Sequence, residues 1–370
     1  MTTSYWLDGG ARSTHADPTS NRVDVNVIGA GVTGCACALA LAERGLRVRV
    51  HEARHVAAGA SGRNGGFALR GGAMPYDRAR EQLGPDRARA LWRLTESTLE
   101  RMESLAGDAF AHVGSLRLAV DETERKALTS ELDALRSDGF DGAWAERLPK
   151  GLGERYCGAL LHPRDGSLHP ARWVRQLAEH AARAGAEIVE GRRAVPDALD
   201  TPVVVAVDGG LAALLPELAP HVVPVRGQML ATEPLRERLF TRPHYARWGY
   251  DYWQQLSDGR LVVGGKRDVD LVGEQTEVDE TTAAVQSAIE SLVVDLVGRL
   301  PAVTHRWSGV WGQTPDLLPL VGEVRDGVWV AGGYSGHGNV LGLACGELVA
   351  RAVAGDQAPE LDLFDPGRFG

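Results

Sequence analysis

Residues 27–34 constrain this chain more than any other segment of its sequence. They read Val-Ile-Gly-Ala-Gly-Val-Thr-Gly, and an apolar run that begins at Val23 leads into them. In a strand, turn and helix of this kind, the first glycine makes the tight turn, the second lets the backbone approach a pyrophosphate, and the third lets the helix pack on the strand. Unpaired amides at the start of the helix donate to the diphosphate. The pattern therefore predicts a dinucleotide-binding unit in an α/β fold.

Glu52 completes this signature. It follows a second predicted strand, 47–50, and lies about 20 residues beyond the glycines, where a carboxylate accepts hydrogen bonds from ribose hydroxyls. An acid at this place repels a 2′-phosphate, so NADP is disfavoured, but the segment alone leaves open which dinucleotide binds. The residues predicted to contact the nucleotide here are Gly29, Ala30, Gly31, Val32, Thr33, Gly34, Glu52, Ala53 and Arg54.

Composition and charge exclude several classes of partner. With 370 residues, 44% of them hydrophobic, the chain is long enough for two domains. A net charge of -9 with scattered basic residues argues against nucleic acid or an anionic membrane as the main partner. The start of the chain lacks the features of a secretory signal, and no apolar stretch approaches the length of a membrane span. We therefore expect a cytoplasmic protein.

The cysteines predict neither a disulfide nor a metal site. Cys35, Cys37, Cys157 and Cys345 show no metal-ligand spacing. Three of them, Cys35, Cys37 and Cys345, fall in apolar helical patterns, where a thiol behaves as a small hydrophobe. We expect these three in the core and no bound metal.

The order of predicted elements indicates two domains, one of them discontinuous. Apolar runs at 186–189, 203–207 and 328–331 are expected to join the first two strands in one parallel sheet, and an apolar helix is expected over 340–354. From 224 to about 321 we expect strands rich in Trp and Tyr. The predicted class is α/β, or α+β overall: a Rossmann-like nucleotide-binding domain of 21–80, 151–210 and 322–370, and an antiparallel-sheet substrate domain of 81–150 and 211–321.

Together these segments resemble the D-amino-acid-oxidase-like family of FAD-dependent oxidoreductases, which includes glycine oxidase, monomeric sarcosine oxidase and gamma-glutamylputrescine oxidase. The resemblance spans nearly the whole chain and rests on residues 27–34 with Glu52, and on 60–66, 224–228 and 332–338. It implies FAD, and two additional glycine-rich segments suit a ligand with an isoalloxazine ring better than NAD. The further residues that it places at FAD are Ala60, Ser61, Arg63, Asn64, Gly65, Gly66, Gly333, Ser335, Gly336, His337, Gly338 and Asn339.

The resemblance also implies a reaction. Family members oxidise a C–N bond of an amine or amino acid to an imine by hydride transfer to flavin N5, and water hydrolyses the imine. The flavin carries the chemistry while the protein supplies position and field, so we assign no obligatory base. Oxygen or another electron acceptor then takes the electrons. The alternatives are a flavin dehydrogenase that does not use oxygen, or a FAD-binding subunit with little activity of its own; the oligomeric state is open.

Departures from the family pattern narrow the expectations. Sarcosine oxidases attach the flavin through a cysteine, but residues 308–311 read Ser-Gly-Val-Trp, so FAD should be noncovalent. Trp311 stands near the position of a carboxylate-binding arginine of glycine oxidase, which weakens the case for a small α-amino acid. Arg70 either holds a substrate carboxylate or forms a structural ion pair. Lys266 either speeds the reaction with oxygen or ends a strand in solvent, and we favour the strand end.

The aromatic residues carry the last set of expectations. Trp248, Tyr250, Tyr252, Trp253, Trp311 and Tyr334 are the residue types that could surround an ammonium group. We expect most of the six in the core and only Tyr252, Trp311 and Tyr334 facing the flavin. His337, between two glycines, is expected to pack beside the isoalloxazine rather than to act as a base. For Arg63 and Asn64, we expect the backbone rather than the side chains to line the flavin.

Overall fold

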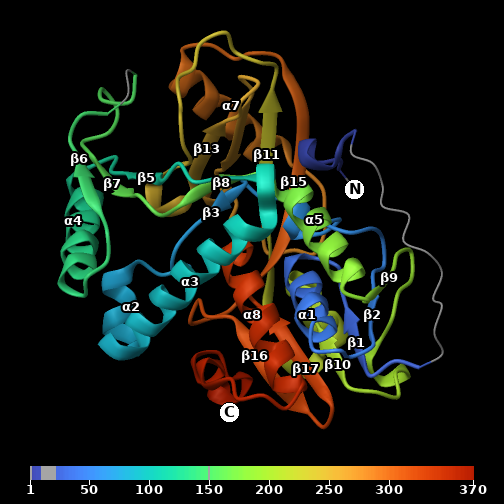
Figure 1. Cartoon of the computed structure of the whole chain (residues 1–370). Coiled ribbons are helices and arrows are strands. Elements are labelled where there is room, and N and C mark those ends of the chain that lie inside the picture. Colours follow the sequence, from blue (N-terminus) through green and yellow to red (C-terminus); the bar gives the residue numbers. More distant parts are fainter. Residues whose placement is uncertain (1, 10–21, 149–150) are drawn as a thin grey trace.

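A computed structural model describes residues 2–9, 22–148 and 151–370 (Figure 1). Within these residues the chain forms a six-stranded sheet, an eight-stranded sheet and a small three-stranded sheet. The predicted fold class, a Rossmann-like unit combined with a largely antiparallel sheet, is confirmed. The predicted division into two domains stays a prediction.

The six-stranded sheet has the order β16-β17-β10-β1-β2-β9, and only the β16–β17 pair is antiparallel. Because β10 lies between β1 and β17, segments from the start, middle and end of the chain build one sheet. Its strands are β1 (Val25–Ile28), β2 (Val48–His51), β9 (Glu187–Val189), β10 (Val203–Val205), β16 (Leu320–Arg325) and β17 (Val328–Gly332).

Successive side chains of these strands point to opposite faces of the sheet and belong to two separate cores. Val27 and Val204 belong to the main core, whereas Ile28 and Val205 pack with a separate cluster that contains Leu211, as the two-residue period of a strand requires. Within the main core, α1 (Val32–Ala42) packs against both α5 (Pro170–Arg183) and α8 (Gly338–Val353). A β-carbon at Gly346 of α8 would lie 2.5 Å from the carbonyl oxygen of Thr33, so glycine permits the close approach of α1 and α8.

The eight-stranded sheet has the order β15-β11-β14-β13-β12-β5-β7-β6. All its pairs are antiparallel except β12 with β5, which differs from a purely antiparallel expectation. Helix α7 (Ala283–Val297) covers one face, at the top of Figure 1. The strands are β5 (Ser115–Leu118), β6 (Ala143–Ala145), β7 (Ala159–His162), β11 (Val223–Thr232), β12 (His244–Ala246), β13 (Asp251–Gln255), β14 (Leu261–Gly265) and β15 (Val303–Gln313).

Two features differ from the sequence expectations. Helix α7 lies in the stretch that we expected to hold only strands: Val285, Ile289 and Val293 are buried at helical spacing, and the high content of β-branched residues hid that period. Strand β7 pairs with β5 in the eight-stranded sheet, although the segment 151–210 was assigned to the nucleotide-binding domain. The boundary at 151 therefore does not coincide with the change of sheet.

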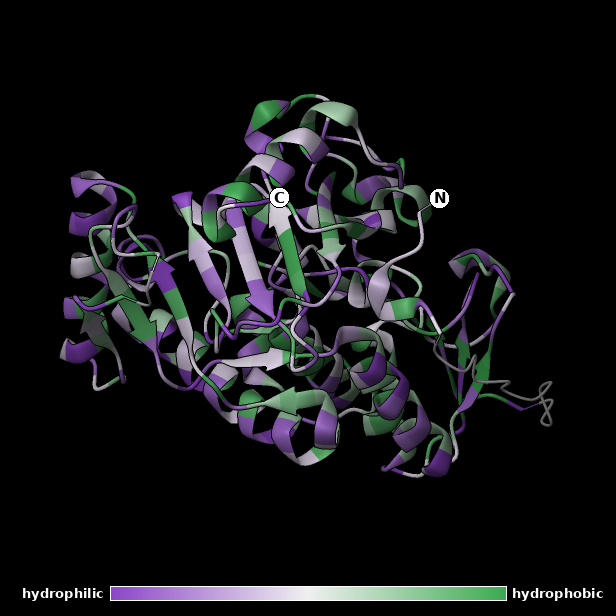
Figure 2. Ribbon diagram, turned by 90° about the horizontal axis from the view of Figure 1, so that it is seen from above, coloured by the Kyte–Doolittle hydropathy of each residue, from purple (hydrophilic) through white to green (hydrophobic). Residues whose placement is uncertain are grey.

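The remaining elements cover the sides of the molecule. They are α2 (Tyr76–Leu83), α3 (Pro85–Ala106), α4 (Glu122–Ser137), the short α6 (Leu211–Leu214), and the three-stranded sheet of β3 (Phe67–Ala68), β8 (Gly166–Leu168) and β4 (Phe110–Ala111). Figure 2 shows purple and green alternating along the outer helices, as expected for helices with one face in the core.

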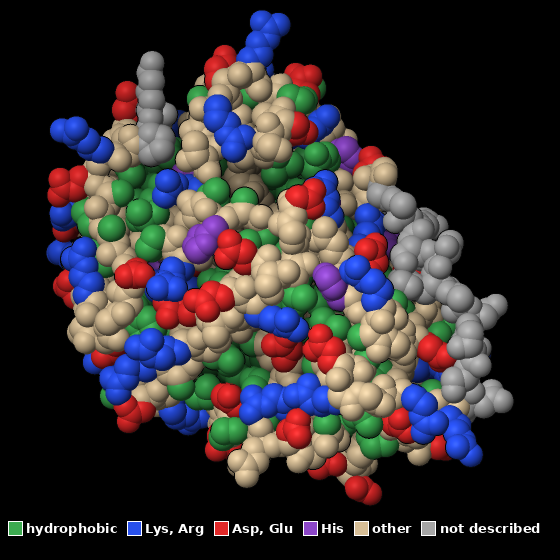
Figure 3. Space-filling model, in the orientation of Figure 1, with side chains coloured by type: hydrophobic (Ala, Val, Ile, Leu, Met, Phe, Trp, Pro, Cys, Tyr) green, Lys and Arg blue, Asp and Glu red, His purple; other side chains and the backbone are tan. Residues whose placement is uncertain are grey.

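The surface carries charges of both signs. Figure 3 shows Lys and Arg side chains intermingled with Asp and Glu over the face seen there. Among the described residues, no helix combines the length and apolar character needed to cross a membrane, and no cluster of His, Cys, Asp and Glu side chains is arranged to hold a metal ion.

Candidate active site

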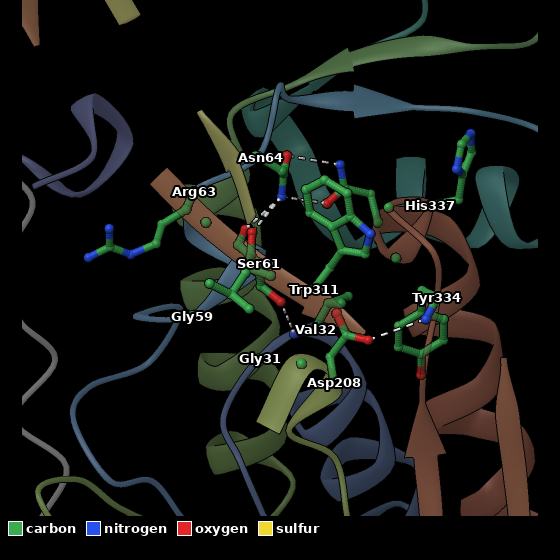
Figure 4. A pocket seen from close by; sticks show the side chains of 18 of the residues that line it. Gly31, Val32, Gly59, Ser61, Arg63, Asn64, Asp208, Trp311, Tyr334 and His337 are labelled. Atoms are coloured by element: carbon green, nitrogen blue, oxygen red, sulfur yellow. Dashed lines mark hydrogen bonds between the residues drawn. The ribbon is translucent and has the colours of Figure 1, made fainter. Parts of the chain in front are cut away.

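A cavity of about 760 Å³ is lined by residues of both larger sheets. Its walls include the turns after β1 and β10 of the parallel sheet, and residues of β11, β13 and β15 of the antiparallel sheet. The glycine-rich segments 59–65 and 335–339 complete it (Figure 4). The three glycine-rich segments singled out in the sequence thus meet at one place.

The turn after β1 has no space for larger residues. Gly29 has a φ of +104°, and a β-carbon there would lie 2.5 Å from the carbonyl oxygen of Ala206. At Gly34 an added β-carbon would lie 1.8 Å from the carbonyl oxygen of Gly29, so α1 rests directly on the turn. Gly31 is the N-cap of α1 and has no side chain to cap the helix. Apart from the Val32 N–H, which Ser61 Oγ accepts, the start of α1 can therefore receive an anion at the cavity wall.

Glu52 lies at the carboxyl end of β2, as predicted. One oxygen accepts the Ala30 N–H at 2.9 Å and the other accepts the Arg54 N–H at 2.8 Å. These bonds fix the orientation of the carboxylate in the cavity wall, and each oxygen keeps a lone pair for another donor. Glu52 therefore presents free acceptor sites at this end of the cavity.

The loop 59–66 is held by polar side chains that also line the cavity. Ser61 Oγ accepts the Val32 N–H at 3.1 Å (Figure 4), and Asn64 Oδ1 accepts the Gly66 N–H at 2.8 Å. The amide of Asn64 donates to Asn339 Oδ1 at 3.0 Å, which joins this loop to the first turn of α8. The amide groups of Asn64 and Asn339 are therefore used largely within the protein.

Residues near the start of the chain support the same loop, a role that the sequence analysis did not assign to them. Trp6 Nε1 donates to the Asn64 carbonyl at 2.8 Å, and Ser4 Oγ donates to the Gly62 carbonyl at 2.9 Å. Both side chains are buried. An aromatic residue in a polar segment was the available signal, because burying it requires a partner surface.

Arg63 points away from the cavity centre in Figure 4. Its guanidinium donates to the carbonyls of Ala58, Thr2 and Ser308 and pairs with Asp279 at 3.1 Å. The side chain is only 5% exposed. Its hydrogen bonds therefore connect the glycine-rich loop to β15 and to residues near the start of the chain.

Tyr252 and Trp311 form an aromatic wall of the cavity. Both lie against glycines of the antiparallel sheet: added β-carbons would lie 2.4 Å from Tyr252 at Gly264 and 2.6 Å from Trp311 at Gly227. Burial raises the pKa of the Tyr252 hydroxyl to about 12, so this group is a neutral donor at ordinary pH. A β-carbon added at a further glycine, Gly65, would lie 3.3 Å from the Tyr252 ring. Glycines thus provide the space for this wall.

Tyr334 and His337 lie on the segment between β17 and α8. The Tyr334 hydroxyl lies 2.9 Å from Thr33 Oγ1 of α1, so its polar end is already bonded. His337 is the N-cap of α8 and makes no capping bond through its side chain. Burial lowers the pKa of the His337 imidazole to about 4, with a smaller contribution from the charge of Arg117. His337 is therefore neutral at ordinary pH.

Asp208 is a cavity residue that the sequence analysis missed. It has a φ of +46°, and its Oδ1 accepts the N–H groups of Gly333 at 2.9 Å and Tyr334 at 3.2 Å (Figure 4). The carboxylate thereby connects the turn after β10 to the segment that leads into α8. The Asp-Gly-Gly sequence at the end of a predicted parallel strand was the available signal, because ligands bind at this edge.

Asp208 should make stability depend on pH. Burial raises the pKa of its carboxyl to about 6, against the opposing effect of the backbone donors. Between about pH 4 and pH 6 the folded protein then keeps a proton that the unfolded chain releases, so the free energy of unfolding falls as pH rises through this window. Asp208→Asn cannot lose this proton. We expect the stability of the variant relative to wild type to increase by about 1–3 kcal/mol from pH 4.5 to pH 7.5, measured by urea unfolding without FAD. A pH-independent difference would contradict the assignment.

The structure places Arg70 and Lys266 in ion pairs and not among the residues that line the cavity. Arg70 pairs with Glu96 at 2.7 Å and has a fully buried side chain. Lys266 Nζ lies 2.9 Å from the Asp251 carboxylate. For Arg70 this geometry agrees with the structural alternative. Lys266 lies at the strand end that we favoured, directly after β14, but its amine is paired with Asp251 rather than solvated.

The aromatic residues are distributed differently from the expectation. Only Trp253 of the six is confined to a core away from the cavity. Trp248, which is 59% exposed, and Tyr250 line the cavity beside Tyr252 and Trp311. Burial of hydrophobic residues is the usual outcome, but a turn with positive φ at Trp248 holds this side chain at the surface.

Comparisons with known proteins agree with this arrangement. The family model DAO, described as FAD dependent oxidoreductase, matches residues 24–352. Probable oxidoreductase OrdL from Rhizobium meliloti is 30% identical, over 94% of this chain and 86% of that protein. Gamma-glutamylputrescine oxidoreductase from Escherichia coli is 27% identical, over 98% of this chain and 91% of that protein. Glycine oxidase from Geobacillus kaustophilus has a structure that superposes with a TM-score of 0.74 at 24% identity, over 91% of this chain and 96% of that one.

The cavity has the features that FAD requires. The turn after β1 has no room for β-carbons at Gly29 and Gly34. Glu52 stands at the ribose position of the first βαβ unit. The starts of two helices, α1 and α8, open into it without side-chain caps from their N-cap residues. The matched family model spans most of the chain. The chain therefore belongs to the DAO family of FAD-dependent oxidoreductases, with FAD as its cofactor.

Proposed function

We propose that this protein oxidises a C–N bond of an amine or amino acid to an imine, using noncovalent FAD. One observation carries the proposal: a single cavity extends from the nucleotide site at Glu52 to the aromatic wall of Tyr252 and Trp311. A cofactor bound at one end thus reaches a mostly apolar chamber at the other. Relatives within the family include an enzyme named for gamma-glutamylputrescine, which is an amine.

In this proposal the residues that line the nucleotide end hold the ADP part of FAD. The N-terminus of α1 with Gly29 and Gly31 receives the diphosphate, and Glu52 accepts from the ribose. The loop 59–66 and the segment 333–339 contact the flavin, largely through their backbone. No cysteine is among the described residues that line the cavity, which supports noncovalent binding.

The bound FAD supplies the two-electron acceptor at N5 of its isoalloxazine. The substrate loses a hydride from carbon and a proton from nitrogen, the C=N bond forms, and water then hydrolyses the imine. Tyr252 and Trp311 exclude water from one side of the chamber and favour the neutral amine, whose lone pair the oxidation needs. The first-turn N–H groups of α8 offer partial positive charge to an anion at the cavity wall, a contribution of about 0.3–2 kcal/mol.

The visible spectrum under anaerobic conditions tests this proposal. We expect the purified protein to show a flavin band that bleaches when one class among polyamines, N-methyl amino acids, D-amino acids and L-amino acids is added. Air would then restore the band rapidly for an oxidase, and only an artificial acceptor would do so for a dehydrogenase. A bound flavin that no amine reduces would contradict the proposal and favour a FAD-binding subunit.

A further inference from the structure

Charged residues beside the aromatic wall form a small network. The carboxylate of Asp251 lies 3.1 Å from Arg247 and 2.9 Å from Lys266, and Arg247 also pairs with Asp268. Two acids, Asp251 and Asp268, thus neutralise two of the three basic residues Arg247, Lys266 and Arg267. The third is Arg267.

Arg267 has no such partner. Within the described part of the chain, its guanidinium makes neither an ion pair nor a hydrogen bond, although it lines the cavity and is only partly exposed. It lies over two aromatic rings instead, 4.9 Å from the centroid of Tyr250 and 5.9 Å from that of Trp311. Stacking on these rings fixes the planar guanidinium but leaves its N–H donors free.

The backbone directs this side chain into the cavity. Gly265, at the end of β14, has a φ of +117°, and a β-carbon there would lie 2.0 Å from the Tyr250 carbonyl oxygen. Lys266 follows with a φ of +58°. Two consecutive residues with positive φ turn the chain so that Lys266 meets Asp251 while Arg267 lines the cavity. Such local strain tends to occur at functional sites.

Other unpaired donors lie beside Arg267. Trp311 Nε1 is buried and has no hydrogen-bond partner among the described residues, and the ring that carries it is one of the two under the guanidinium. The Tyr252 hydroxyl likewise makes no hydrogen bond within the described chain, and its environment includes the charge of Arg267. A buried donor without a partner is costly, so these groups are suited to a ligand with acceptor atoms.

The other described charged residues that line the cavity neither pair with Arg267 nor provide a second free cation at the aromatic wall. Arg63 is fully bonded, and Arg54 and Arg193 belong to the nucleotide end, where the Arg54 N–H donates to Glu52. The nearest acid along the chain that lines the cavity, Glu277, makes no ion pair with Arg267. The cavity therefore holds a cation without a counter-ion at its aromatic end.

We infer that Arg267 binds a carboxylate of the substrate, with Trp311 Nε1 and the Tyr252 hydroxyl as further donors. The inference rests on the proposed amine oxidation and specifies its substrate class: an amine that carries a carboxylate, as an amino acid does. A guanidinium presents two parallel N–H donors to a carboxylate, which a neutral amide or a polyamine cannot match. Arg267 is thus the residue that selects for the anion. It takes the role for which the sequence analysis considered Arg70.

Matched ligands test this inference on the holoenzyme. We would titrate wild type, Arg267→Gln and Arg267→Lys with simple carboxylates that lack an amine, and follow the shift of the flavin absorption band. Anaerobic bleaching by amino acids would be compared with bleaching by their carboxamides. Arg78→Gln, which removes an exposed arginine paired with Glu81, is the control for net charge.

We expect Arg267→Gln to raise the dissociation constant of the carboxylates about 10- to 100-fold, with an intermediate effect for Arg267→Lys and none for Arg78→Gln. Wild type should bleach with amino acids and not with their carboxamides. Equal use of acids and carboxamides, with no effect of Arg267→Gln, would overturn the inference and leave amine oxidation in place. Carboxylate binding that depends on Arg267, without bleaching by any amine, would support the anion site and contradict the proposed oxidation.

Discussion

Gly34→Ala is expected to yield a protein that purifies without FAD. The added β-carbon would lie 1.8 Å from the carbonyl oxygen of Gly29, and backbone atoms on both sides prevent a side-chain adjustment. Helix α1 must therefore move away from the turn, which displaces the N–H groups that we propose receive the diphosphate. We expect the free energy of unfolding to fall by about 3 kcal/mol or more. The flavin absorbance per protein and urea unfolding measure the two effects.

Gly153→Ala is the matched control. A β-carbon at Gly153 would meet nothing within 4 Å, and this glycine is not among those with positive φ. We expect wild-type FAD content and a change in unfolding free energy within about 0.5 kcal/mol. Full FAD occupancy in Gly34→Ala would show that the turn after β1 does not hold the cofactor.

Arg63→Met is expected to destabilise the fold by about 3–5 kcal/mol, because the change leaves buried carbonyl groups and Asp279 without their cation. The arginine side chain donates to carbonyls from three separate segments, so its loss should loosen the loop 59–66 as a whole. Urea unfolding of the FAD-free protein measures this effect independently of the cofactor. Methionine keeps much of the buried volume, so the comparison reports mainly the lost polar contacts.

Arg325→Met provides the comparison on the surface. Arg325 pairs with Asp197, but its side chain is 40% exposed, and such pairs contribute about 0–1 kcal/mol. The free energy of unfolding and the FAD content of Arg63→Met together separate a structural role of its side chain from a contact with the cofactor. Unchanged stability with loss of FAD would mean that the guanidinium contacts the cofactor directly, contrary to its hydrogen bonds in the structure.

The sequence predicted the fold class, the family and the cofactor because these depend on local patterns. The glycine turn before α1, the acid after β2 and the apolar strands each carry a period or spacing that is visible in one stretch of chain. Helix α7 was missed for a related reason: valine and isoleucine favour strands, and tertiary packing overrode this propensity.

The direction in which side chains point could not be predicted in the same way. The contacts of Arg63 with β15 and with Thr2 join residues far apart in the sequence. Nothing in the order of residues distinguishes the paired Arg70 and Lys266 from the unpaired Arg267, since each follows a glycine-rich or strand segment. The difference arises from backbone turns and from which acids lie within reach, and both are settled only in three dimensions.

The position of β10 between β1 and β17 has a consequence for the order of events during synthesis. Strand β1 is translated about 300 residues before β17, α8 and the segment 333–339. The nascent chain therefore lacks one wall of its cofactor cavity until β17 and the segment that follows it have been made. FAD should join only after β17 and the segment 333–339 have been made, and ribosome-bound fragments that end before β17 should remain colourless.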